Sequence, residues 1–386
     1  MRIDEFGKKV FLLIKQKMLI KTILKVLNNR IVKVLKVLNN RIESRRIRRL
    51  ANKYLSYYLD DLSRSLIEVK LITWETWNFT NILSKYIELG YDKWNIPELE
   101  RYDESKVFYV SGNGDCYEYC ILLLKHSKYS DRTKIIGQDI SIFENAKCDS
   151  VLIAIAENGN DQQELTNELK DRFPNRIIHP LPYKKLIGTF GWQYFDVFSP
   201  KEEEVFINAG AFQGETDIDF VKWTNNAYKK IYMFEPIKDN VDICRKVYEE
   251  NNIERVEIFC KGTWSYTGVL HFTQGENSQG AITESGDARI DVISIDDAVK
   301  RVGDRGGVTF LKMDIEGAEL RALQGARETI LRGKPRMAIC IYHKRTDLYE
   351  IPQYLLSLVP EYRFKVRQYA SNNWETVLYA AIEGDW

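Results

Sequence analysis

Val205-Phe206-Ile207-Asn208-Ala209-Gly210-Ala211-Phe212-Gln213-Gly214-Glu215-Thr216 is the stretch that decides the fold of this 386-residue chain. Its apolar beginning predicts a short buried strand, which runs directly into a turn that contains Gly210 and Gly214. Glycine permits positive φ angles and lets a ligand touch the backbone, because no Cβ atom is in the way. A helix is expected next, with its free N–H groups facing the turn. Such units occur in many nucleotide-binding folds, so the motifs further along the chain decide its meaning.

Residues 204–386 continue in an α/β pattern. The residues at the strand ends are those that carry chemistry. Glu235 ends the second strand, 21 residues beyond Gly214, where an acidic side chain can accept two hydrogen bonds from a ribose diol. Pro236 stops that strand. Gly262 and Trp264 follow the third strand and are expected to flank an adenine ring. The remaining predicted strands are 307–313, 336–342 and an antiparallel pair, 362–368 and 375–382.

With these motifs in place, residues 201–386 resemble the FkbM-type S-adenosylmethionine-dependent methyltransferases. The most specific matching block is Lys312-Met313-Asp314-Ile315-Glu316-Gly317-Ala318-Glu319. The other matching pieces are Ile207–Gly214, Phe234–Pro236, Tyr342-His343 and Glu375–Ala380. The resemblance implies a seven-stranded class I methyltransferase sheet, S-adenosylmethionine as methyl donor, and transfer to oxygen, often on sugars or polyketide-like natural products.

Two positions depart from the family pattern. Asn208 stands where the family has Asp, and an amide cannot pair with the ammonium group of the cofactor. Gln368 stands in an Arg-Gln-Tyr sequence where the family commonly has Arg-His-Tyr. The predicted cofactor site therefore combines the first turn with the ends of the later strands: Asn208, Ala209, Gly210, Phe212, Gly214, Thr216, Glu235, Pro236, Gly262, Trp264 and Asp314.

Two side chains are predicted to be catalytic, Asp314 after the fourth strand and His343 after the fifth. Ligands bind beyond the carboxyl ends of parallel strands, so both are expected in one crevice. Methyl transfer from a sulfonium requires an aligned oxygen and removal of its proton. His343 is the expected base, and Asp314 is expected to orient it, to position the substrate or to hold a divalent metal ion. We assign no set of metal ligands.

Structural interpretations of the same residues stay open at this point. His343 could form a hydrogen bond at a strand end, and Asp314 could cap a helix at 316–331. Glu316 and Glu319 could form the acidic first turn of that helix.

The front half divides into a helical region, 1–105, and an α/β module, 106–200, ahead of the methyltransferase domain at 201–386. The module resembles the Rossmann-like modules attached to sugar-modifying enzymes of polysaccharide synthesis. Its Gly112-x-Gly114 turn is an incomplete dinucleotide fingerprint, because Tyr117 replaces the third glycine. Residues 180–200 are predicted to be a linker.

Positive charge is concentrated at the start of the chain. Residues 1–50 hold 15 Lys and Arg against 3 Asp and Glu, and an apolar and basic unit recurs between Leu24 and Ile42 with an eleven-residue offset. This repeat predicts a basic amphipathic helix that docks on anionic lipid or packs against another subunit, including a second copy of the chain. Nucleic acid is a weaker alternative, because the arm lacks aromatic residues for base stacking. The apolar run at 10–14 is too short to span a bilayer.

Six cysteines without a C-x-x-C pair favour a reducing cytosol. We therefore expect a cytoplasmic O-methyltransferase, peripheral at the inner membrane face, that acts on a sugar or on a glycan or glycolipid precursor. One alternative is a catalytically impaired methyltransferase domain serving as a binding or scaffold protein in a glycan-assembly complex. A third, motivated only by the basic arm, is an RNA methyltransferase.

Overall fold

A computed structural model describes residues 42–76, 78–156, 159–181, 187–273, 281–282, 288–303 and 307–386. The chain separates into two units, residues 1–50 and residues 51–386. In the first unit, residues 42–50 are helical. Nearly all of the basic repeat predicted between Leu24 and Ile42 lies outside the described residues. No helix in the described part of the chain is long and apolar enough to cross a membrane.

The second unit is built around a seven-stranded sheet with the order β14-β15-β13-β12-β5-β6-β7. Five strands are parallel and the last two pair antiparallel, as predicted. Almost every residue of the central strands is buried, which is typical of a sheet with helices on both faces. The strands are β5 (Glu204–Ala209), β6 (Tyr228–Phe234), β7 (Val256–Phe259), β12 (Phe310–Met313), β13 (Arg336–Cys340), β14 (Arg363–Gln368) and β15 (Thr376–Ala381).

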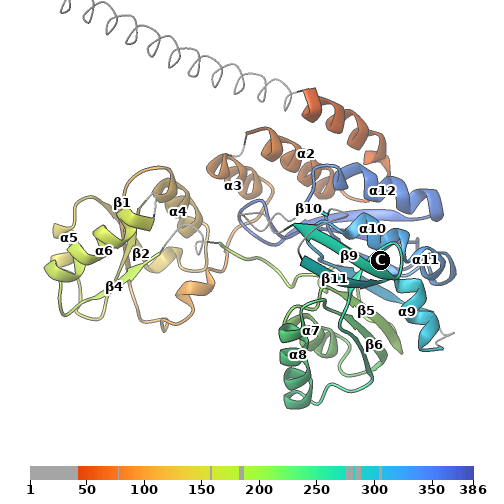
Figure 1. Ribbon diagram of the computed structural model, residues 1–386. Coiled ribbons are helices and arrows are strands. Elements are labelled where there is room, and N and C mark those ends of the chain that lie inside the picture. Colours follow the sequence, from red (N-terminus) through yellow and green to blue (C-terminus); the bar gives the residue numbers. More distant parts are fainter. Residues whose placement is uncertain are drawn as a thin grey trace, which may run out of the picture. The chain divides into compact units, whose positions relative to one another are not determined.

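Helices connect these strands, and α7 and α8 lie together beside β5 and β6 (Figure 1). The single helix expected at 316–331 is wrong, because the chain forms two short helices there. The Asp296 carboxylate accepts hydrogen bonds from the N–H groups of Glu328 and Thr329, at 2.9 and 2.8 Å, and so starts the second helix separately. The helices are α7 (Glu215–Trp223), α8 (Lys238–Glu250), α9 (Ile295–Arg301), α10 (Glu319–Gln324), α11 (Arg327–Gly333) and α12 (Asp347–Leu358).

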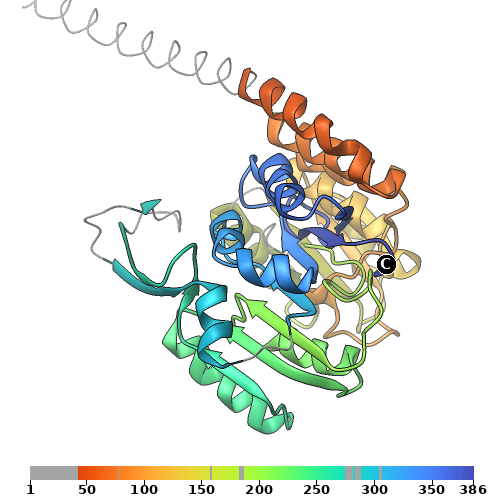
Figure 2. The same cartoon turned by 90° about the vertical axis from the view of Figure 1, so that its right-hand side faces the viewer.

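A smaller sheet with the order β10-β9-β11-β8 follows β7, and Figure 2 shows β9 and β11 next to α9. Thr267, just before β9, donates a hydrogen bond to Asp297 of α9 and so ties the two elements together. The sheet was not among the elements predicted from the sequence. Its strands are β8 (Gly262–Thr263), β9 (Gly268–Thr273), β10 (Ala281–Ile282) and β11 (Ala288–Ile293).

The module before residue 200 has a parallel four-stranded sheet with the order β2-β1-β3-β4, so the predicted strands are confirmed. A Cβ atom on Gly112 would lie 2.4 Å from the Ile155 carbonyl oxygen, so this glycine is needed for the close approach of β1 and β3. The elements are β1 (Phe108–Gly112), α4 (Asp115–Lys125), η3 (Ser130–Arg132), β2 (Thr133–Gly137), α5 (Ser141–Glu144), β3 (Val151–Ile155), α6 (Gly159–Arg172) and β4 (Ile177–Pro180).

Among the helical segments between residues 51 and 100, α2 packs against β14 at the edge of the large sheet, and α3 packs against α2 and α4. On α2, the Ser63 hydroxyl accepts a hydrogen bond from the Val366 N–H at 2.8 Å, and the buried Lys70 donates to the Asn373 carbonyl oxygen at 2.5 Å. These contacts cover β14, which would otherwise be an open sheet edge. The elements are η1 (Asn52–Tyr57), α2 (Asp61–Thr76), α3 (Phe79–Glu88) and η2 (Pro97–Leu99).

The predicted linker at 180–200 needs a correction in its second half. Tyr194, Phe195 and Phe198 are buried in the core of the seven-stranded sheet, with exposures of 7%, 2% and 5%. The rings of Phe195 and Phe198 contact Phe206, Phe310 and Tyr379 of the sheet. Burial of three large aromatic side chains makes this segment part of the packed unit.

Candidate functional site

The predicted site residues gather at one edge of the large sheet. Strands β6, β5, β12 and β13 are neighbours and run parallel, so their carboxyl ends meet at this edge. The glycine turn follows β5, Glu235 follows β6, Asp314 follows β12 and His343 comes three residues after β13.

The glycine turn lies directly against the turn that begins at Asp314. Gly210 has a φ of +85°, and a Cβ atom there would lie 1.9 Å from the Asp314 carbonyl oxygen. The buried Lys312 donates a hydrogen bond to the Gly210 carbonyl oxygen at 2.6 Å. Gly214, with a φ of +93°, precedes α7. Gly210 is therefore required for the contact between the ends of β5 and β12, whether or not it also contacts a ligand.

Glu235 is held by the backbone of two residues whose side chains are apolar and exposed. Its carboxylate accepts hydrogen bonds from the N–H groups of Phe212, at 3.1 Å, and Ile237, at 2.9 Å. The Phe212 and Ile237 side chains are 58% and 56% exposed. A carboxylate flanked by exposed apolar groups suits a ligand with a polar sugar and an apolar ring face. The Asn240 amide donates a third hydrogen bond, to Oε1 at 3.3 Å, so Oε2 is the oxygen that keeps a further lone pair for such a ligand.

The remaining residues predicted for the cofactor differ in accessibility. Asn208 and Ala209 are fully buried in β5, and Asn208 lies near the buried Asp217 of α7. Pro236 and Gly262 lie next to each other, because a Cβ atom on Gly262 would be 3.9 Å from Pro236. Thr216, in the first turn of α7, and Trp264, after β8, are both half-buried.

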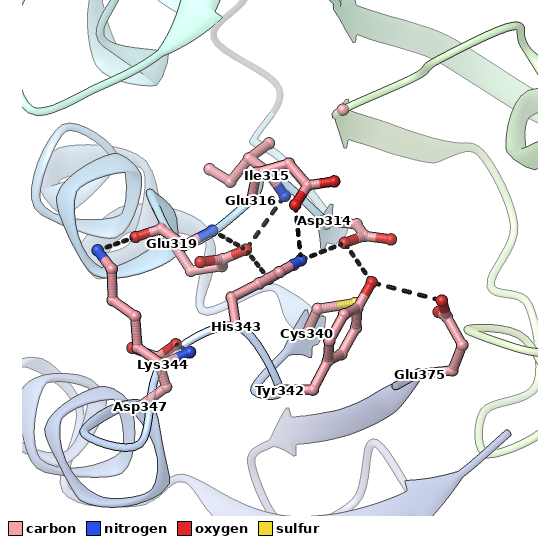
Figure 3. A network of polar contacts seen from close by, with 12 residues as sticks. Asp314, Ile315, Glu316, Glu319, Cys340, Tyr342, His343, Lys344, Asp347 and Glu375 are labelled. Carbon is pink, nitrogen blue, oxygen red and sulfur yellow. Dashed lines mark hydrogen bonds and ion pairs between the residues drawn. The ribbon is translucent and has the colours of Figure 1, made fainter. Parts of the chain in front are cut away.

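His343 is the centre of a polar network that Figure 3 shows from close by. Its Nδ1 lies 2.9 Å from Glu319 Oε1, and its Nε2 lies 3.6 Å from Asp314 Oδ1 and 3.5 Å from Glu316 Oε2. Burial disfavours the charged imidazole, but the contacts with these carboxylates, led by Glu319, outweigh burial and raise the pKa of His343. The structure therefore brings the two predicted catalytic residues together.

Glu319 is the residue that orients the imidazole, a role the sequence analysis gave to Asp314. Its side chain is fully buried, and Oε1 also accepts hydrogen bonds from the N–H groups of Ile315, at 3.1 Å, and Gly317, at 3.3 Å. The helix-cap interpretation of Asp314 is wrong, because α10 begins after Ala318 and has no side-chain cap. Of the two glutamates that one interpretation placed in the first turn of the helix, Glu319 lies there but faces inward, and Glu316 lies before the helix.

Asp314 is held by two tyrosines. Tyr194 donates a hydrogen bond to its Oδ2 at 2.9 Å, and Tyr342 donates to its Oδ1 at 3.1 Å. The Tyr342 hydroxyl also lies 3.4 Å from Glu375 Oε1, and burial, followed by the charge of Asp314, raises the pKa of Glu375. Sequence reasoning did not assign Tyr194 and Glu375 to the site. Glu375 opens one of the matching motifs, but Tyr194 lies in the segment predicted as a linker.

Gln368 is the last residue of β14, and its side chain binds the β14–β15 turn. Its side-chain amide donates hydrogen bonds to the carbonyl oxygens of Ala370, at 2.5 Å, and Asn372, at 3.0 Å, and the side chain is fully buried. The family departure at this position thus alters a turn-stabilising residue. A group of His, Cys, Asp and Glu side chains that could hold a metal ion is present among the described residues: Asp314, Glu319 and His343 each place a ligating atom within 4.8 Å of the others.

Comparison with known proteins gives one family match. Residues 208–366 match the model of the methyltransferase FkbM domain. No curated protein matches the chain.

Among solved structures, the methyltransferase FkbM of Methylobacillus flagellatus KT is 18% identical, with 78% of this chain and 98% of that chain covered and a TM-score of 0.40. A putative methyltransferase of Streptococcus mutans in complex with SAH is 12% identical, with 47% and 90% covered and a TM-score of 0.29. A putative O-methyltransferase of Klebsiella pneumoniae is 8% identical, with 47% and 73% covered and a TM-score of 0.30.

Proposed function

From the match of residues 208–366 to the methyltransferase FkbM domain, we propose that the chain transfers a methyl group from S-adenosylmethionine to a hydroxyl oxygen of a sugar or of a glycan or glycolipid precursor. The observation that supports the proposal most is the meeting of two groups of residues at one sheet edge. The glycine turn and Glu235 form a place for a nucleoside, and His343 and Asp314 stand at the ends of the two next strands.

The Glu235 carboxylate is the group proposed to accept the ribose hydroxyls, with Phe212 and Ile237 on either side. Gly210 and Gly214 leave room for the amino-acid part of the cofactor. A sulfonium group carries a positive charge, and the acidic side chains Asp314, Glu316, Glu319 and Glu375 give this edge the complementary sign.

The reaction breaks the bond between sulfur and the methyl carbon and forms a bond between that carbon and the acceptor oxygen. The hydroxyl proton must leave as this bond forms, since a neutral hydroxyl is a poor nucleophile. Glu319 lies at Nδ1 of His343, so Nε2, on the side of Asp314 and Glu316, is the nitrogen proposed to accept the proton. Asp314, with both oxygens hydrogen-bonded to tyrosines, positions the acceptor. The products are a neutral thioether, a methyl ether and a proton on His343.

Calorimetric titration of the full chain with S-adenosylmethionine tests the cofactor assignment. Glu235→Ala is expected to weaken binding by about 1.5–3 kcal/mol for each lost charged hydrogen bond. Glu257→Ala, a change of the half-buried glutamate on β7, serves as the control and is expected to leave affinity unchanged. Equal affinity in wild type and Glu235→Ala would contradict the ribose assignment. A wild-type chain that binds no cofactor would favour the scaffold alternative.

Two parts of the proposal, the class of acceptor and the contact with the membrane, rest on the sequence alone. The sugar class comes from the family resemblance. The proposed peripheral contact with the inner membrane face comes from the basic residues of the segment 1–50.

A further inference from the structure

A cavity lies at the β14 edge of the large sheet, and none of the residues predicted for the cofactor or for catalysis lines it. Its volume is about 400 Å³, and its walls come from α2, the turn after α3, the segment 190–197 and β14. Ligand pockets have volumes of about 300–1,000 Å³, so the cavity is large enough for a small polar ligand.

The β14 wall of the cavity carries two positive charges. Lys365 and Arg367 are two residues apart on this strand, so their side chains lie on the same face of the sheet. Arg367 already has a counter-ion, because its guanidinium bonds to the Asp60 carboxylate at 2.7 and 3.3 Å. Lys365 has no hydrogen bond or ion pair with any residue that the structure describes, and its Nζ lies 4.6 Å from the centre of the Trp386 ring.

The Lys365 ammonium is therefore a half-buried charge without a counter-ion. Burial lowers the pKa of Lys365, and the charge of Arg367 adds to this effect more than Asp60 opposes it. A partly desolvated cation is stabilised by an anion that forms a charged hydrogen bond with it. The cavity thus favours a ligand with an anionic group at the β14 wall.

The segment 190–197 brings a carboxylate to the same cavity. Asp196 accepts a hydrogen bond from the Tyr369 hydroxyl, and the N–H groups of Trp192 and of Asp196 itself also approach its carboxylate. An ionised carboxylate has about four acceptor sites, so one remains for a hydroxyl group of a ligand. Asp196 forms no ion pair with Lys365 or Arg367, so the cavity holds an acid and a base apart.

An aromatic side chain completes the lining. Phe190 is 37% exposed, and its ring packs edge-on against the buried Tyr91 with 5.0 Å between the ring centres. The Tyr91 hydroxyl accepts a hydrogen bond from the Gln368 N–H at 3.2 Å, which fixes this pair of rings to β14. A fixed and partly exposed ring offers a surface for the apolar face of a sugar ring.

We propose that this cavity binds an anionic sugar, with its phosphate or carboxylate at Lys365, a hydroxyl group at Asp196 and the ring against Phe190. A free sugar phosphate and an acidic sugar within a glycan share this chemistry. The cavity is separate from the site proposed for methyl transfer, and sugar binding there does not depend on that reaction.

The cavity and the candidate site share the segment 190–197. Tyr194 donates a hydrogen bond to Asp314 at 2.9 Å, and Gln193 donates one to Glu375 at 2.6 Å. An acidic glycan that reaches both places is held by two contacts, and this consequence, unlike the sugar site itself, rests on the proposed function.

Calorimetric titration of the full chain with glucose 6-phosphate and with glucuronate tests the proposal, with glucose and inorganic phosphate as the reference ligands. At least one of the two anionic sugars is expected to bind about tenfold more tightly than either reference ligand, and the tighter one identifies the anionic group. Lys365→Gln is expected to weaken the binding of that sugar about tenfold or more, because a charged hydrogen bond is lost. Asp196→Asn, which keeps an acceptor for Tyr369, is expected to weaken sugar binding but not the binding of inorganic phosphate.

Arg363→Gln is the matched control. Arg363 lies on the same face of β14, two residues before Lys365, and does not line the cavity. Its variant is expected to bind the anionic sugar as wild type does. Circular dichroism and thermal unfolding show that the three variants fold like wild type.

Two results would overturn the sugar site: neither anionic sugar binds more tightly than the reference ligands, or Lys365→Gln binds the anionic sugar as tightly as wild type. Failure of the proposed function has a separate signature. In that case the wild type does not bind S-adenosylhomocysteine, while the anionic sugar still binds and Lys365→Gln still weakens it.

Discussion

Gly210 is the residue at which a single methyl group is expected to be most harmful. Ala at this position meets the Asp314 carbonyl oxygen at 1.9 Å and must adopt a φ of +85°. Neither strand end can move away, because β5 and β12 are paired through the whole of β12. We expect Gly210→Ala to lower the free energy of unfolding by more than about 3 kcal/mol, measured by urea denaturation.

Gly303→Ala provides the comparison for Gly210→Ala. Gly303 also has a positive φ, +70°, but a Cβ atom there has nothing within 4 Å. The Gly303→Ala variant should therefore lose only about 1–2 kcal/mol of unfolding free energy, which is the conformational penalty of a positive φ. Equal losses in the two variants would mean that the contact with Asp314 carries no cost.

Asp217 makes stability depend on pH. Burial raises its pKa to about 6, opposed by a hydrogen bond from Tyr248. Because the folded chain binds this proton more tightly than the unfolded chain, stability falls as the pH rises from about 4 to about 6. The expected loss from this group is up to about 3 kcal/mol.

Asp217→Asn removes the titrating group and keeps an oxygen that accepts from Tyr248. As the pH rises from 4 to 7, wild type is expected to lose unfolding free energy relative to this variant. Asp219→Asn, on the exposed side of the same helix, is the control and should follow wild type. A difference that does not change with pH would refute the assignment.

At the scale of elements, the central strands are joined by a buried ion pair that the sequence does not reveal. Arg336 of β13 bonds to Glu204 of β5, two strands away, and both side chains are almost fully buried. The Arg336 guanidinium also lies 5.5 Å from the centre of the Phe198 ring. This ion pair fixes the start of the sheet on the side opposite the site.

Arg336→Met alone leaves the Glu204 charge buried and is expected to cost about 3–5 kcal/mol of unfolding free energy. The double variant Arg336→Met with Glu204→Gln removes both charges and should recover part of that loss. Denaturant titration of the two single variants and the double variant measures the coupling. Additive losses would show that the two side chains do not interact.

At the scale of the whole molecule, the basic segment 1–50 is a separate unit from residues 51–386. Each Lys or Arg close to an anionic membrane surface contributes about 1 kcal/mol of binding. The full chain is therefore expected to float with vesicles that contain an anionic phospholipid, and a chain lacking residues 1–50 is not. Binding to neutral vesicles alone, or binding that does not weaken in high salt, would contradict an electrostatic contact.

The role of the helices between residues 51 and 100 is also visible only at the scale of the whole molecule. Lys70 reaches from α2 to the turn that precedes Glu375, and burial lowers its pKa to about 7. Contacts between residues about 300 positions apart along the chain thus hold the turn that carries one of the site carboxylates. Hydropathy along the chain gives no sign of such a contact.

The sequence by itself determined the five parallel strands, the antiparallel pair that follows them and the sheet edge at which the predicted site residues gather. It did so because apolar runs, glycine turns and acidic residues at strand ends are local patterns, and the carboxyl ends of neighbouring parallel strands must meet. Asp314 and His343 could be placed together on these grounds.

Only the tertiary structure decided how the site is held. Glu319 turns inward to the imidazole, Tyr194 reaches Asp314 from the segment predicted as a linker, and the side chain of Gln368 binds the β14–β15 turn. These roles depend on which side chains far apart in sequence come within hydrogen-bond distance. The packing of α2, of the aromatic segment and of the sheet sets that distance, and no local pattern encodes it.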